Sequence, residues 1–265
     1  MRRYLPFVKK PPLVPVIRMQ GVIAAQARGA ALSDAALAPL IERAFAKGKP
    51  AAVALSINSP GGSPAQSSLI ASRIRRLADE KGIKVYAFVE DVAASGGYYL
   101  ATAADEIFVD RHSIVGSIGV ISAGFGFHEL IDRYGIERRV YTAGNSKSML
   151  DPFKPEKAED VARLRSIQDQ IHADFIDQVK TRRGARLSGD DLFTGEIWVG
   201  KAAEDVGLVD GVAHLVPKLK EMFGDKVRID PYRLRRPFLS RLGVSVVDDA
   251  LTLAEDRAAF ARFGL

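Results

Sequence analysis

The chain has 265 residues, of which 47% are hydrophobic and 26% are charged, a composition typical of a globular protein with a substantial core. It contains no cysteine, which excludes disulfides, thiol catalysis and cysteine-ligated metals. The formal charge of +6 would allow contact with an anionic surface, but no zinc-finger spacing or aromatic-interleaved basic stripe accompanies it. We therefore do not expect nucleic-acid binding.

Basic residues gather near the two ends of the chain, within residues 1–10 and 232–241. Prolines and Arg18 interrupt the N-terminal apolar stretch well before the roughly 20 residues that a membrane-spanning helix needs. We expect a cytoplasmic protein without a transmembrane segment, whose basic ends can make peripheral contact with the inner membrane.

Apolar runs and amphipathic stretches alternate along the chain. The pattern predicts strands over 14–23, 53–57, 84–89, 106–109, 118–122 and 138–141. It predicts helices over 34–46, 65–81, 97–104, 155–181 and 247–263. Strands alternating with helices indicate an α/β fold with a largely parallel sheet. We expect a single domain over 1–265, with its core at about 50–215 and peripheral segments at 1–13 and about 232–265.

Two predicted strand-to-helix turns share one pattern of small residues, Asn58 to Gly62 and Val92 to Gly97. In open parallel sheets such turns lie along one edge, where ligands bind. Either glycine pair alone is typical of a tight turn. Together they resemble a nucleophile elbow, although Ala93 replaces the first glycine of G-x-S-x-G. We predict Ser95 as a nucleophile, and as oxyanion and substrate-binding positions Gly61, Gly62 and Gly96.

A serine hydroxyl needs a base, because it is a poor nucleophile at neutral pH. The chain has four histidines, and His112, which follows a predicted strand, is the best placed of them. A lysine can also serve if its amine is neutral. Lys147 lies in a small-residue loop after a predicted strand, whereas most other lysines occupy charged helices or tails. Spacing alone favours Lys147 only weakly.

Four stretches, which occur in family order, resemble the signal peptide peptidase A family, also called the protease IV family. They are Asn58–Gly62, Asp91–Tyr99, Gly116–Val120 and Thr194–Asp210. The resemblance implies the fold of Clp protease and crotonase and a Ser-Lys dyad with Ser95 as nucleophile and Lys147 as base. It also implies that the Gly62 N–H lies in the oxyanion hole and that the Ser117 hydroxyl lies beside the lysine amine.

The function implied by this resemblance is that of a serine endopeptidase. It would hydrolyse hydrophobic peptides, such as cleaved signal peptides or unfolded segments, through an acyl-enzyme and without a metal or cofactor. By resemblance, short members form homo-oligomeric rings in which serine and lysine come from neighbouring subunits. Lys147 would then act either within its own chain or on the next. Family members commonly carry an N-terminal membrane anchor, which we do not find in this sequence.

Two alternative functions remain possible for a protein with this fold. A crotonase-like acyl-CoA enzyme would also use paired backbone oxyanion donors, but it would not need Lys147. A catalytically silent assembly protein would keep the fold and function without Ser95.

Overall fold

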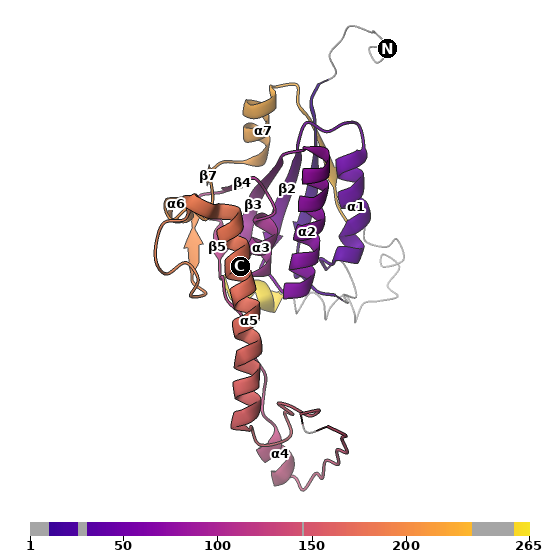
Figure 1. The fold of residues 1–265 in the computed structure, drawn as a ribbon, viewed down its shortest axis with the longest axis vertical. Coiled ribbons are helices and arrows are strands. Elements are labelled where there is room, and N and C mark those ends of the chain that lie inside the picture. Colours follow the sequence, from indigo (N-terminus) through magenta and orange to yellow (C-terminus); the bar gives the residue numbers. More distant parts are fainter. Residues whose placement is uncertain (1–10, 26–30, 145, 235–256) are drawn as a thin grey trace.

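The computed structural model describes residues 11–25, 31–144, 146–234 and 257–265. These residues form an eight-stranded sheet with the order β6-β5-β3-β2-β1-β8, in which β4 pairs with β3 and with β7 (Figure 1). Every pairing is parallel except that of β5 with β6. The strands are β1 (Leu13–Gln20), β2 (Val53–Ser59), β3 (Val85–Ala94), β4 (Glu106–Val109), β5 (Ile114–Gly116), β6 (Ile197–Val199), β7 (Gly211–Val212) and β8 (Arg228–Tyr232).

The helices cover the two faces of the sheet unequally. One face packs against α1 (Asp34–Ala46), α2 (Pro64–Lys81) and α3 (Gly96–Ala101). The other face packs against α7 (Leu215–Phe223). Further helical elements are α4 (His128–Arg133), α5 (Ala158–Arg183), the short 3-10 helix η2 (Gly184–Arg186) and α6 (Gly200–Asp205).

Local sequence explains where the first two helices begin. The Ser33 hydroxyl accepts a hydrogen bond from the N–H of Ala36, and the Ser63 hydroxyl accepts one from the N–H of Gln66. Each serine thereby satisfies an N–H group that the first helical turn leaves without a partner. The second helix ends at Gly82, whose φ of 61° lies in the left-handed region that favours glycine.

The strands predicted over 118–122 and 138–141 are wrong. The chain forms β5 slightly earlier, at Ile114–Gly116, and then leaves the sheet. Ile121 and Tyr141 are largely exposed, and neither segment takes part in a strand pairing among the described residues. Most of the helix predicted over 247–263 and of the basic segment 1–13 lies outside the described residues, although residues 257–261 are helical.

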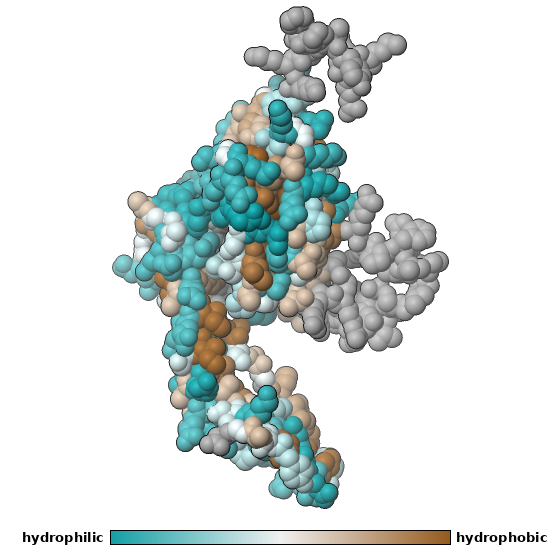
Figure 2. All heavy atoms as spheres, turned by 45° about the vertical axis from the view of Figure 1, so that its right-hand side comes forward, coloured by the Kyte–Doolittle hydropathy of each residue, from teal (hydrophilic) through white to brown (hydrophobic). Residues whose placement is uncertain are grey.

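Residues 120–170, which we call the arm, project from the rest of the molecule, which we call the body (Figure 1). The arm contains α4, the following loop and the first half of α5. None of its described residues is buried. Exposed apolar side chains are spread along it (Figure 2), and they include Ile121, Phe125, Leu130, Tyr134, Ile136 and Tyr141. Among the described helices, none combines the length and the apolar character that crossing a membrane requires.

Candidate active site

Ser95 occupies the turn between β3 and α3, and its backbone is strained. Its φ of 51° and ψ of −121° lie in a region that non-glycine residues rarely adopt, at a cost of about 1–3 kcal/mol. The N–H of Ser95 donates to the Gly116 carbonyl at 2.8 Å, and its own carbonyl accepts from the N–H of Tyr99 at 3.0 Å. This is the sharp strand-to-helix geometry that presents a serine hydroxyl in nucleophile elbows.

The structure brings the two glycine-containing turns together, as the sequence predicts. A Cβ atom on Gly61 would lie 2.9 Å from the Cβ of Ser95, so only glycine allows this approach. Gly96 faces the same turn, because a Cβ atom added to Gly96 would lie 3.4 Å from the Gly62 nitrogen. Gly62 is exposed, and its N–H donates to no group in the described part of the chain. The Gly62 nitrogen thus lies near Gly96, the residue after Ser95, without an acceptor in the described residues.

Ser117 also lies close to this turn. Strand β5 pairs with the last part of β3, and in this register Gly116 is the partner of Ala94. Ser95 and Ser117 therefore follow paired residues on adjacent strands. Ser117 has a φ of 51°, and its N–H donates to the Glu196 carbonyl at 2.6 Å. It lines a cavity of about 390 Å³ together with Gly195, Glu196, Ile197, Arg262 and Phe263.

Lys147 is not brought to Ser95 within one chain. It is exposed and lies in the loop between α4 and α5, and Figure 1 shows that this loop lies at the far end of the arm from α3. In the described residues, its ammonium group has no carboxylate partner. Backbone hydrogen bonds hold this end of the arm locally, including one from the Phe127 N–H to the Pro152 carbonyl at 2.6 Å.

No described histidine contacts Ser95. His112 and His214 both bind Asp110, with His214 Nε2 at 2.7 Å and His112 Nδ1 at 3.3 Å from its carboxylate oxygens. The hydrogen bond from the backbone N–H of His112 and that from the His214 side chain lower the pKa of Asp110 to about 2. His172 Nε2 donates to the Ile118 carbonyl at 3.0 Å, at the root of the arm. The fourth histidine, His128, lies in α4 on the arm. Within one chain, the described histidines therefore supply no base for Ser95.

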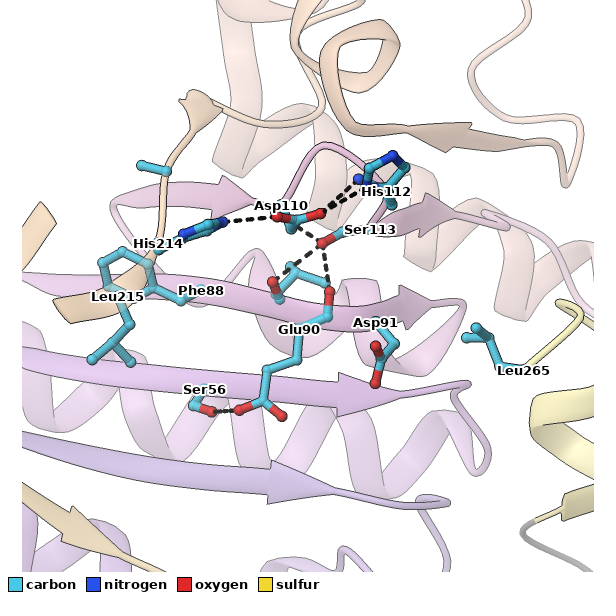
Figure 3. Close-up of a pocket in the computed structure, with 12 residues that line it drawn as sticks. Ser56, Phe88, Glu90, Asp91, Asp110, His112, Ser113, His214, Leu215 and Leu265 are labelled. Carbon is cyan, nitrogen blue, oxygen red and sulfur yellow. Dashed lines mark hydrogen bonds and ion pairs between the residues drawn. The ribbon is translucent and has the colours of Figure 1, made fainter. Parts of the chain in front are cut away.

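A second cavity of about 390 Å³ opens on the α7 face of the sheet, the face opposite α3 (Figure 3). Polar side chains at its wall are paired with each other. Glu90 accepts hydrogen bonds from Ser56 Oγ at 2.6 Å and from Arg18 at 3.1 Å. Of the residues considered for the site, only His112, the histidine weighed as a base, lines this cavity. The described residues contain no cluster of three or more side chains suited to hold a metal ion.

The sequence patterns did not predict the polar cluster of Arg18, Ser56 and Glu90. The available signal was a polar residue within the mainly apolar run of each of three strands, namely Arg18 in β1, Ser56 in β2 and Glu90 in β3. The parallel register pairs Arg18 with Ser56 directly. Such a signal can be recognised only when the order and register of the strands are known.

Comparison with known proteins identifies the family. The model of peptidase family S49 matches residues 78–223, which is more than half of the chain. A Brucella melitensis protein called Na(+)/H(+) antiporter NhaA is 48% identical over 95% of the chain and 37% of its own length. The chloroplastic serine protease SPPA of Arabidopsis thaliana is 32% identical over 76% of the chain and 32% of its own length. The chain thus spans only about a third of either relative.

The fold is also found among solved structures. A mutant of the 1510-N membrane-bound stomatin-specific protease, in complex with a substrate peptide, has a TM-score of 0.53 at 15% identity. The match covers 90% of this chain and 99% of that one. The predicted α/β fold of the Clp protease and crotonase type, with its largely parallel sheet, is confirmed. The matching family model shows that the chain belongs to peptidase family S49.

Proposed function

We propose that the chain is an endopeptidase in which Ser95 is the nucleophile and Lys147, supplied by a neighbouring subunit, is the general base. The observation that carries the proposal is the strained Ser95 turn, enclosed by Gly61, Gly62 and Gly96. Membership of peptidase family S49 supports a nucleophilic serine, and within one chain no described histidine is recorded in contact with Ser95. That membership also argues against an acyl-CoA enzyme and against a silent assembly protein.

The proposed mechanism uses only side chains and backbone groups. The neutral amine of Lys147 takes the proton of Ser95 Oγ, which attacks the peptide carbonyl. The N–H of Gly62 donates to the oxygen that becomes negative, while the Ser117 hydroxyl contacts the lysine amine. Lys147 then gives its proton to the leaving amine, and a water molecule hydrolyses the acyl-enzyme. Proton transfer by such a base accelerates the reaction by about 10²- to 10⁴-fold.

The arm supports a site shared between subunits. It carries Lys147 away from its own Ser95, and its apolar side chains have no covering layer among the described residues. Phe125 and Tyr141 are 81% and 91% exposed. Aromatic side chains grouped on a surface are typical of protein–protein interfaces. A second copy of the chain would cover the arm and would receive its lysine, so a homo-oligomer would complete the site.

We infer that the substrates are hydrophobic peptides, such as cleaved signal peptides or unfolded segments. The structural relative was solved with a substrate peptide, which supports peptide binding by this fold. The same relative is described as membrane-bound. On this likeness we infer that the chain makes peripheral contact with a membrane, and we place it at the cytoplasmic side of the inner membrane.

The test mixes two inactive variants, Ser95→Ala and Lys147→Ala, under conditions that allow subunit exchange. Each variant alone is expected to lose about 10²-fold or more in kcat, and the mixture is expected to recover activity. Lys154→Ala, which removes another exposed lysine of the arm, is the matched control and should keep full activity. If both variants stay inactive when mixed, Lys147 acts within its own chain. If either variant keeps wild-type turnover, the dyad is wrong.

A further inference from the structure

The turn that carries Ser95 depends on its surroundings. Helix α3 is only six residues long, so its own hydrogen bonds hold it weakly. A strained backbone conformation such as that of Ser95 persists only where contacts with the surrounding structure fix it. On one side, the Gly61 backbone and the Gly116 carbonyl confine the turn. A contact on the other side of α3 is therefore needed to keep the turn in place.

Tyr98 supplies that contact from one helical turn beyond Ser95. Its side chain is fully buried in the core beneath α3. Its hydroxyl donates to the Leu208 carbonyl at 2.7 Å, across 110 residues of sequence. Burial raises the pKa of this hydroxyl, so it remains a hydrogen-bond donor throughout the range in which the peptidase would work.

The loop that receives this hydrogen bond, Gly207–Asp210, is itself held firmly. Arg183 at the end of α5 donates through Nε to the Gly207 carbonyl at 2.9 Å. Its other two nitrogens donate to both carboxylate oxygens of Asp210, at 2.7 and 3.1 Å. Asp210 also accepts from the N–H of Ile107 in β4 at 2.7 Å. Burial opposes the ionisation of Asp210, but these hydrogen bonds outweigh it and lower its pKa.

We propose that Tyr98 is a positioning residue for the reaction that we assign to Ser95. Its hydroxyl ties α3 to the Gly207–Asp210 loop, and this tie keeps the strained turn that aims Ser95 Oγ at the peptide carbonyl. The inference rests on the proposed function. Tyr98 itself touches neither substrate nor the reacting atoms, so its loss should slow the chemical step and leave substrate binding unchanged.

The experiment compares Tyr98→Phe with Tyr232→Phe. The Tyr232 hydroxyl is also buried but has no hydrogen-bond partner in the described part of the chain, so it is a matched control. For each variant we would measure kcat and KM for a peptide substrate, the rate at which a fluorophosphonate modifies Ser95, and the melting temperature. All rates are measured well below the melting temperature, where each variant is fully folded.

We expect Tyr98→Phe to lower both kcat and the modification rate by about 10- to 100-fold, because small displacements of reacting atoms have effects of this size. KM should stay the same, and Tyr232→Phe should behave as wild type. Arg183→Lys should act in the same direction, because lysine cannot reproduce the forked contacts to Gly207 and Asp210. It provides the test if Tyr98→Phe does not fold.

Two results would overturn the positioning role. One is a folded Tyr98→Phe variant whose Ser95 is modified as fast as in wild type. The other is a fall in kcat and in the modification rate that is fully explained by a smaller fraction of folded protein. The proposed function fails separately, if the fluorophosphonate does not modify Ser95 in the wild-type protein or if Ser95→Ala retains full turnover.

Discussion

The body and the arm contrast in how the chain holds the residues assigned to catalysis. In the body, backbone groups of β2, of β5 and of the loop before α2 enclose the Ser95 turn, and only glycine fits at Gly61 beside it. In the arm, no described residue is buried, and local contacts hold the loop with Lys147. A single chain therefore supplies the packing for the nucleophile but not for the base.

This difference suggests a division of roles. The body obtains its stability from burial of apolar strands and helices, which forces the strained serine into place. The arm exposes its apolar side chains and gains stabilisation only when another surface covers them. Substitutions in the body should therefore change the free energy of unfolding, whereas substitutions in the arm should change assembly and activity.

The largest expected effect on unfolding comes from adding one methyl group to the body. A Cβ on Gly62 would overlap the Ile23 carbonyl, and its φ of 140° is unfavourable for any other residue. Gly62→Ala should lower the free energy of unfolding by about 3 kcal/mol, measured by urea denaturation. Gly124→Ala in the arm, where nothing lies within 4 Å, should change it by less than about 0.5 kcal/mol. If both variants lowered the free energy of unfolding equally, the arm would be packed as tightly as the body.

A smaller effect on stability, but a clear effect on assembly, is expected from the arm surface. The double variant Phe125→Ser, Tyr141→Ser removes two exposed aromatic rings. It should lower the oligomer mass measured by light scattering and reduce peptidase activity by about tenfold or more. The melting temperature of the protomer should not change. Val216→Ser, an exposed apolar residue of α7 in the body, serves as the control. A double variant with unchanged mass and activity would contradict the proposed interface.

The smallest effect concerns Asp110 and its two histidines on the body. The pKa of Asp110 is lowered from 3.8 to about 2, so its contribution to stability is present above about pH 4 and is lost as pH falls toward 2. Asp110→Asn should lower the melting temperature slightly at neutral pH, and the difference from wild type should disappear near pH 2. Asp225→Asn, at another exposed position, is the control. A difference that persists unchanged at pH 2 would exclude ionisation as its cause.

Sequence patterns predicted the body better than the arm. The apolar run at 53–57 and the amphipathic run at 65–81 form β2 and α2, with small differences at their ends. Their apolar residues recur at the period of a buried strand and of a helix with one buried face. The apolar residues around Ile121 and Tyr141 misled the same reasoning, because they face outward on the arm. The short strands β6, β7 and β8 were missed because their pairing depends on partners distant in sequence.

The sequence by itself determined the family, the α/β fold and the two turns that meet at Ser95, because small residues and buried strands leave a clear local pattern. Only the tertiary structure decided that Ser95 is strained, that Lys147 lies on a projecting arm and that the Tyr98 hydroxyl binds Leu208. The physical reason is that local patterns record which residues are buried. The contacts that orient Ser95 join segments far apart in the chain, and packing alone determines which of them meet.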